Sequence, residues 1–232
     1  MEAGEAREFW LGDSDGPMGD VGAFMASELR VDRADLAAYI RQIEAPRALI
    51  AVVGAPASGK SHLAAELAAE LNAHAPGSAV VVAMDGFHLP NRVLAERGLL
   101  PRKGAPETFD IEGLSRSLGA IRAPGTAHLV PVFDRAADEP DPEGAAIPAT
   151  ARHLIVEGNY LLLTRPGWRD LFPLFDLTIR LAVPEATLRA RLAARWADLP
   201  ADEAARRIEE NDLPNGRLLR TENRAADLVI AG

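Results

Sequence analysis

The residues with the clearest chemistry in this 232-residue sequence form a glycine-rich run with one lysine and one serine, Gly54-Ala-Pro-Ala-Ser-Gly-Lys-Ser61. The run matches the pattern G-x-x-x-x-G-K-[ST], in which glycines let successive backbone N–H groups point at phosphate oxygens. A lysine at this position reaches the β- and γ-phosphates of a nucleotide, and the serine hydroxyl binds Mg²⁺. The predicted nucleotide-binding residues are Gly54, Ala55, Pro56, Ala57, Ser58, Gly59, Lys60, Ser61 and His62.

Two carboxylates stand where predicted strands end. Asp85 follows the apolar run 79–84, and Glu157 closes the run 154–157. An alcohol becomes a good nucleophile only when its proton is removed, and Asp85 is the predicted base for that step. Glu157 is the predicted partner of Ser61 in binding a metal ion. Each acid also has a structural interpretation, because turns and helix starts use carboxylates as caps.

Further cations are expected, because phosphoryl transfer spreads negative charge over the equatorial phosphate oxygens. Arg191 and Arg195 lie four residues apart in a predicted helix and so share one face, although spacing alone favours a solvated basic face. Only two of the 25 basic residues are lysines, Lys60 and Lys103, which favours a specific role for each. Arg135 follows another predicted strand and therefore also faces the binding edge.

Short apolar runs alternate with helical patterns along the chain. Strands alternating with helices form a mostly parallel sheet, and such sheets bind ligands at the carboxyl ends of the strands. The acidic stretch 138–143 is predicted to be a solvated hairpin or loop rather than a metal site. Strands are predicted at 48–53, 79–84, 127–133, 153–156, 177–182 and 227–230, and helices at 31–44, 61–72, 111–121, 184–197 and 202–210.

Composition limits the remaining function classes. The formal net charge of −9 argues against a nucleic-acid-binding surface, which usually carries an excess of basic residues. There is no cysteine, so disulfides, thiolate metal sites and cysteine nucleophiles are excluded. No apolar run reaches membrane-spanning length, and the acidic N-terminus lacks the layout of a signal peptide, so we expect a soluble cytoplasmic protein.

The length fits one α/β domain, which we place at residues 25–232. Residues 1–24 contain many Gly, Asp and Glu residues and are expected to form a poorly ordered N-terminal extension. Met18 and Met25 offer alternative translation starts in this region. The sequence does not fix the oligomeric state, and a homodimer is one arrangement that it leaves open.

Several motifs together resemble the P-loop family of uridine kinases, phosphoribulokinases and bacterial (type I) pantothenate kinases. Within that family the chain looks most like small bacterial proteins described as nucleoside/nucleotide kinase-like or as fructose transport system kinases. Only the phosphate loop is specific by itself, whereas the motifs are specific in combination. The resemblance covers the chain from about Arg47 to the C-terminus, and its motifs are 54–61, 84–91, 102–110, 131–135, 157–162, 191–196 and 211–215.

The resemblance implies a P-loop three-layer α/β/α sandwich with a mostly parallel, five-stranded sheet. It also implies ATP as the donor, Mg²⁺ as the cofactor, a small-molecule hydroxyl as the acceptor and a lid that closes on the phosphates. Taken with the residues above, it predicts a catalytic set of Lys60, Asp85, Arg191 and Arg195 and a metal site of Ser61 and Glu157. The predicted substrate-binding set is Asp85, His88, Arg102, Lys103, Phe133, Arg135 and Tyr160.

The acceptor stays open between nucleosides, pantothenate-like molecules, sugars and sugar phosphates. Phe133 and Arg135 depart from the aromatic and histidine residues that pantothenate and uridine kinases use in this region. Arg135 and Lys103 suit an acceptor with its own negative charge, or else they serve the donor.

The alternative enzyme class is a nucleoside monophosphate kinase, which needs no base at Asp85 because its acceptor is already an anion. A regulatory GTP or ATP switch is less favoured. Guanine-specific switches usually read the base with an Asn/Thr-Lys-x-Asp loop, and lysine occurs here only at positions 60 and 103, outside that context.

Overall fold

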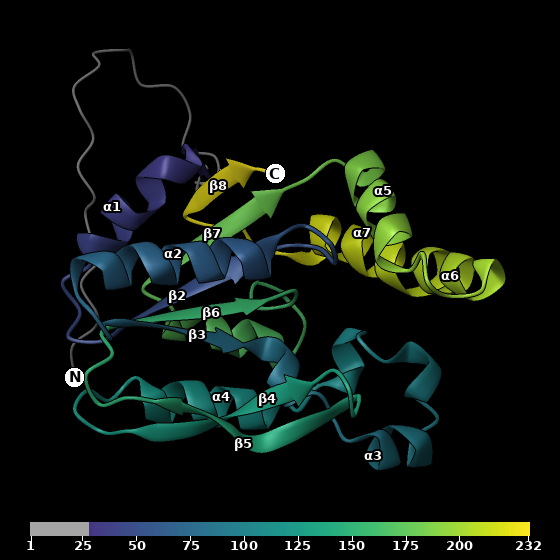
Figure 1. Ribbon diagram of the computed structural model, residues 1–232, viewed down its shortest axis with the longest axis horizontal. Coiled ribbons are helices and arrows are strands. Elements are labelled where there is room, and N and C mark those ends of the chain that lie inside the picture. The colour runs from purple at the N-terminus through teal and green to yellow at the C-terminus, as the bar shows by residue number, and fades with distance from the viewer. Residues whose placement is uncertain (1–27) are drawn as a thin grey trace, which may run out of the picture.

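A six-stranded parallel β-sheet runs through the centre of the computed structural model, which describes residues 28–232 (Figure 1). Every residue of the central strand β2 is buried, which accounts for its unbroken apolar sequence. The extension expected at 1–24 lies outside the described residues. The strand order is β1 (Leu29–Arg30), β8 (Leu228–Ala231), β7 (Leu177–Ala182), β2 (Ala48–Val53), β6 (His153–Gly158) and β3 (Ala79–Ala83).

The predicted α/β class with a mostly parallel sheet is confirmed, but the strand count of five is wrong by one. The additional strand is β1, which has only two residues and pairs with β8 at the sheet edge. The strand predicted at 127–133 exists but does not join this sheet. It forms β4 (His128–Asp134), which pairs antiparallel with β5 (Glu139–Ile147) in a separate hairpin. The acidic stretch 138–143 lies at the turn and first residues of β5, as expected for a hairpin.

Helices cover both faces of the sheet (Figure 1). α1 (Leu36–Arg41) and α2 (Lys60–His74) pack against one face through leucine and alanine side chains. The other face is covered by α4 (Ile111–Ile121) and by the 3₁₀ segment Trp168–Leu174. The α2 and α4 helices follow the predicted periodicity, with buried apolar residues at three- and four-residue spacing.

Four more helices lie beyond the carboxyl ends of the strands, on the right of Figure 1: α3 (Asn91–Glu96), α5 (Glu185–Arg195), α6 (Ala201–Arg206) and α7 (Leu213–Glu222). The helix predicted at 202–210 is correct in place but too short. A π-helical segment, Arg207–Asp212, continues α6 directly into α7. None of the helices formed by residues 28–232 combines the length and apolar character needed to cross a lipid bilayer.

Arg47 is a buried arginine that joins three segments at the amino-terminal side of the sheet. Its side chain is only 2% exposed, and its guanidinium donates hydrogen bonds to six backbone carbonyl groups. One of these carbonyls belongs to Ile121, the last residue of α4, where the negative end of the helix dipole favours a cation. The acceptors are the carbonyl oxygens of Ile121, Ala123, Thr126, Pro148, Ala149 and Ala151.

We predict that Arg47→Leu lowers the free energy of unfolding by about 3–5 kcal/mol, because buried carbonyl groups lose their donors together. Urea unfolding followed by circular dichroism measures this loss. Arg116→Leu is the control, since Arg116 lies on the exposed side of α4 and makes only a surface ion pair, worth about 0–1 kcal/mol. Equal losses in the two variants would contradict the role assigned to Arg47.

Gly86 allows the β4–β5 hairpin to approach the end of β3. A Cβ atom at Gly86 would collide with the carbonyl group of Pro131 and lie 2.9 Å from the backbone nitrogen of Val132. The hairpin backbone therefore fills the space beside this glycine.

Gly86→Ala is therefore expected to destabilise the fold by about 1–3 kcal/mol, the usual cost of overpacking. Gly119→Ala makes a matched control, because a Cβ atom there meets nothing within 4 Å and Gly119 lies inside α4. Its expected effect is a gain of up to about 1 kcal/mol from helix propensity. Changes of the same sign in urea unfolding of both variants would show that the hairpin contact is unimportant.

Candidate active site

The register of three parallel strands brings the predicted loop and the two acids to one edge. Glu157 of β6 pairs with Val52 of β2 on one side and with Ala83 of β3 on the other. Gly54, which follows β2, and Asp85, which follows β3, therefore lie just past the level of Glu157, at the same edge of the sheet. Asp85 lies in a short 3₁₀ turn, Met84–Phe87, directly after β3.

The phosphate loop has the backbone shape of an anion site. Ala57 and Gly59 adopt left-handed conformations, with φ of 61° and 94°, and α2 begins at Lys60 directly after them. Successive N–H groups in such a turn, followed by a helix N-terminus, favour a bound anion. Gly54 allows the turn to close, because a Cβ atom there would collide with the Ser58 hydroxyl.

Glu157 is a buried carboxylate beside the loop. It is 6% exposed, and its Oε2 atom has no hydrogen-bond partner within residues 28–232. Burial raises its pKa above the usual value near 4.5, and the negative charge of Asp85 raises it further, whereas Lys60 and a hydrogen bond with Ser61 lower it.

An unpaired buried carboxylate oxygen next to a serine hydroxyl fits Mg²⁺. No group of three or more His, Asp or Glu residues that could hold a metal ion occurs in residues 28–232. A site with one or two protein ligands is usual for Mg²⁺, which takes its other ligands from water and substrate phosphates. Ser61 and Glu157 are the residues that would hold the ion.

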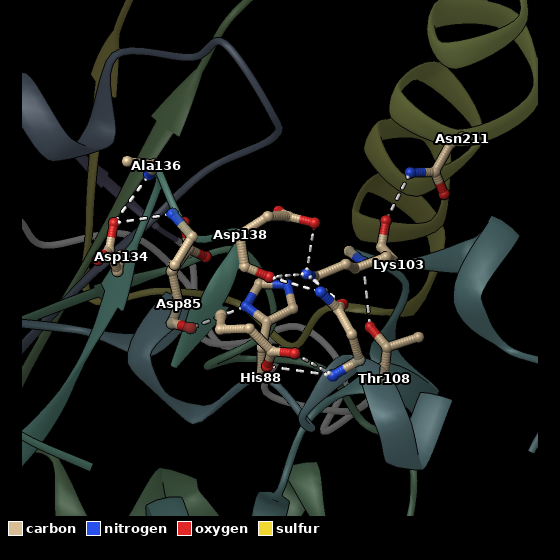
Figure 2. Close-up of polar contacts among 12 residues, drawn as sticks. Asp85, His88, Lys103, Thr108, Asp134, Ala136, Asp138 and Asn211 are labelled. Atoms are coloured by element: carbon tan, nitrogen blue, oxygen red, sulfur yellow. Dashed lines mark hydrogen bonds and ion pairs between the residues drawn. The ribbon is translucent and has the colours of Figure 1, made fainter. Parts of the chain in front are cut away.

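Asp85 faces the cleft beside a cation and a stacked imidazole. Its Oδ2 atom lies 3.6 Å from Nη2 of Arg135, which comes from the hairpin. The Nδ1 atom of His88 lies 2.7 Å from the carbonyl oxygen of Asp85 (Figure 2). Because a carbonyl can only accept, Nδ1 carries the proton. Burial lowers the pKa of His88, so at neutral pH the ring is uncharged and Nε2 is a hydrogen-bond acceptor.

The His88 ring is held between two phenylalanines. Its centroid lies 4.0 Å from that of Phe109 and 4.9 Å from that of Phe133. The Phe133 ring also makes a cation–π contact, since Nζ of Lys103 lies 5.0 Å from the ring centroid. Aromatic and imidazole rings therefore form one wall of the acceptor side of the cleft.

The ammonium group of Lys103 is occupied by protein acceptors (Figure 2). Its Nζ atom donates to Oδ1 of Asn91 at 2.6 Å and to the carbonyl oxygen of Asp138 at 2.5 Å, and it lies 2.8 Å from Oδ2 of Asp138. These three contacts match the three donors of a lysine ammonium. In this conformation Lys103 braces the hairpin tip, and its role toward a substrate stays a prediction.

The two predicted helix arginines have different surroundings. Arg191 turns to the phosphate loop itself and donates to the carbonyl oxygen of Ser58 at 3.1 Å. Arg195 faces the cleft, with its guanidinium carbon 5.0 Å from the ring of Trp196. The predicted core side of α5 is confirmed, since Leu188 and Leu192 are buried.

A cleft of about 1100 Å³ collects most of the predicted residues. The structure does not bring Tyr160 into it: the ring is fully buried against Phe109 and Trp168, and its hydroxyl donates to the carbonyl oxygen of Gly104 at 2.7 Å. Ser58 and Glu157 lie beneath its surface, and Gly54 and Ala55 border a neighbouring hollow. The predicted residues that line the cleft are Pro56, Ala57, Gly59, Lys60, Ser61, His62, Asp85, His88, Arg102, Lys103, Phe133, Arg135 and Arg195.

Four asparagines that were not among the predicted site residues line the cleft: Asn91, Asn159, Asn211 and Asn215. Asn159 is 9% exposed, and its Oδ1 atom has no partner in the described part of the chain. Its position two residues after Glu157, past the end of a central strand, was the signal that could have identified it. Asn211 and Asn215 follow a predicted helix and not a strand, so their signal in the sequence was the motif 211–215 of the family resemblance.

Comparison with known proteins gives relatives at the level of sequence and structure. No family model matches the sequence. The chain is 34% identical over 221 residues to "Putative uridine kinase C227.14" of Schizosaccharomyces pombe, covering 87% of this chain and 94% of that protein. It is 37% identical over 161 residues to a pantothenate kinase of Parvibaculum lavamentivorans, covering 65% of this chain and 48% of that protein.

A crystal structure described as a "putative fructose transport system kinase", from Silicibacter sp. TM1040, superposes with a TM-score of 0.80. It is 47% identical in sequence, and the match covers 86% of this chain and 98% of that one. The family is identified by relatives that match over nearly their whole length, and by the phosphate loop and two acids at one edge of the sheet. The chain belongs to the P-loop kinase family of uridine kinases, phosphoribulokinases and bacterial pantothenate kinases.

Proposed function

We propose that this kinase transfers the γ-phosphoryl group of ATP to a hydroxyl group of a small polar molecule, with Asp85 as the base. Kinases of this family use ATP with Mg²⁺, and the chain is an ATP-dependent phosphotransferase. The role of Asp85 as the base is supported by its position in the cleft, one strand beyond Glu157 and two strands from the phosphate loop. A carboxylate on that side suits an acceptor whose proton must be removed.

The proposed step moves one phosphoryl group and one proton. The acceptor oxygen forms a bond to the γ-phosphorus, the bond from that phosphorus to the β–γ bridging oxygen breaks, and ADP leaves. The hydroxyl proton passes to a carboxylate oxygen of Asp85. Lys60 and Arg195 line the donor side and stabilise the charge on the transferred group. Mg²⁺, held by Ser61 and Glu157, would neutralise phosphate charge when bound.

Hydrogen-bond acceptors that line the cleft support a polyhydroxylated substrate. In the cleft, Nε2 of His88 is an acceptor by the tautomer argument, and Oδ1 of Asn159 lacks a partner within residues 28–232. Asp85 adds a carboxylate. Buried acceptors are costly when unpaired, so a ligand that donates several hydroxyl hydrogens suits this lining.

A nucleoside monophosphate kinase is the second candidate, because Arg102, Arg135 and Arg206 give the cleft cations that could hold an acceptor phosphate. The two functions differ in their need for Asp85. A phosphate acceptor is already ionised, whereas a hydroxyl acceptor requires the base.

The direct test is an ATP-consumption screen over nucleosides, pantothenate, sugars, sugar phosphates and nucleoside monophosphates. Lys60→Ala serves as the blank, because it removes the loop lysine expected on the β- and γ-phosphates. We expect acceptor-dependent ADP formation with a hydroxyl compound. Absence of any acceptor-dependent signal, together with no binding of ATP, would contradict the proposal.

With the acceptor identified, Asp85→Asn is expected to lower kcat about 10²- to 10⁴-fold, because the amide cannot accept the proton. The affinity for MgATP should change by less than about threefold, since Asp85 lies on the acceptor side. Asp141→Asn is the control, because Asp141 is an exposed acid in the neighbouring β4–β5 hairpin. Unchanged turnover in Asp85→Asn would exclude the hydroxyl mechanism and favour the monophosphate kinase.

Glu157→Gln is expected to preserve the stability of the protein and to weaken its binding of Mg²⁺. Since burial raises the pKa of Glu157, its ionised form opposes folding at neutral pH, and the variant should be at least as stable as the natural protein without nucleotide. Its half-saturating Mg²⁺ concentration should rise by about 10- to 100-fold, as for other weakened metal sites. Glu112→Gln, an exposed change on α4, should alter neither the urea midpoint nor the Mg²⁺ titration. A destabilised Glu157→Gln with normal Mg²⁺ dependence would refute the metal role.

A further inference from the structure

The loop 98–104, which we name the acceptor loop, is held from two sides. On one side, Nζ of Lys103 binds Asn91 and Asp138, as described above. On the other side, Nδ2 of Asn211 donates to the carbonyl oxygen of Lys103 at 2.9 Å (Figure 2). Asn211 belongs to the π-helical segment, so the acceptor loop is tied across the cleft to the C-terminal helices.

The π-helical segment also binds the end of α5. Nε1 of Trp196, the residue after α5, donates to Oδ2 of Asp212 at 2.8 Å. The guanidinium of Arg207 lies 4.8 Å from the ring of the same tryptophan. Asn211 itself is fixed by Asn215 of α7, whose Nδ2 donates to its Oδ1 at 3.2 Å. A π-helical turn places side chains in a register that an α-helix would not provide, and such turns often occur at functional sites.

Along its buried side, α5 contacts the phosphate loop. Leu188 and Leu192 pack in one cluster with Ala55 and Ala57, and Arg191 binds the carbonyl oxygen of Ser58. A continuous series of packed and hydrogen-bonded groups therefore leads from the nucleotide loop through Trp196 and Asn211 to Lys103. Each link is a direct contact, and Asn211 is where the series crosses the cleft.

We infer that Asn211 is a positioning residue that couples occupation of the nucleotide loop to the order of the acceptor loop. The inference rests on the proposed function, in which the Asp85 side of the cleft receives the acceptor. Nucleotide binding fixes α5, α5 fixes the π-helical segment, and the Nδ2–H of Asn211 then holds the carbonyl group of Lys103. The acceptor site is thereby completed after the donor binds, and the two substrates bind cooperatively.

Hydrogen–deuterium exchange of the full chain, with and without MgADP, tests this coupling without requiring a known acceptor. In the natural protein we expect MgADP to slow amide exchange in residues 98–104 by about three- to tenfold. A factor of this size corresponds to the net stabilisation from one hydrogen bond. Asn211→Ala should abolish that slowing, while calorimetry gives an MgADP affinity within about threefold of the natural value. Asn211→Asp, which keeps the size and Oδ1 but lacks the donor, should behave the same way.

Asn72→Ala is the matched control. Like Asn211, Asn72 makes two hydrogen bonds through its side chain, but both are with the backbone of Ala79, at the opposite end of the sheet. It should lower the melting temperature and leave the MgADP effect on 98–104 unchanged.

Equal slowing in the natural protein and in both Asn211 variants would overturn the inference, as would MgADP binding with no slowing in the natural protein. Failure of the natural protein to bind MgADP would overturn the proposed function as well, so the two failures are distinguishable.

Discussion

Strand register is the constraint on which the rest of this structure depends. The backbone of Glu157 pairs on both sides, with Val52 and with Ala83. A shift of the pairing by one residue would turn the Glu157 side chain to the other face of the sheet. The same pairing fixes where the phosphate loop leaves β2 and where Asp85 leaves β3. The buried residues of β2 and β6 pack on both faces of the sheet and stabilise this register through those contacts. Hydrophobic burial in the sheet thus decides the positions of the polar groups at its end.

The cleft is rich in cationic side chains, although the chain as a whole is acidic. The net charge is −9, yet the cleft gathers two lysines and five arginines around its acids. Some of these cations are already bound: Arg135 faces Asp85, and Lys103 holds the hairpin tip. Others, such as Lys60 beside the left-handed turn, face the position expected for phosphates. Local arrangement therefore matters more than overall charge for binding a small anion.

The positions in the fold that were predicted correctly from the sequence depend on short-range patterns. The phosphate loop, Asp85 and Glu157 follow apolar runs whose ends are visible in the sequence, and α4 begins and ends where its periodicity does. What could not be predicted depends on long-range contacts. Asn211 binds Lys103, which lies 108 positions earlier in the chain. Strand β4 pairs with β5 and not with the main sheet, and no local sequence pattern distinguishes these two pairings. Tyr160 closely follows Glu157 in the sequence but is buried against Trp168 and against Phe109, and Phe109 is distant in the sequence.

The central claim is that donor and acceptor meet in one cleft, so that the phosphoryl group passes directly from ATP to the acceptor oxygen. The stereochemistry at phosphorus tests this claim most directly. The reaction is run on ATP whose γ-phosphorus is chiral by oxygen isotopes, with the acceptor identified by screening, and the product configuration is determined. A single in-line transfer predicts inversion. Retention would contradict the account, because it requires two displacements through a phosphorylated group of the protein.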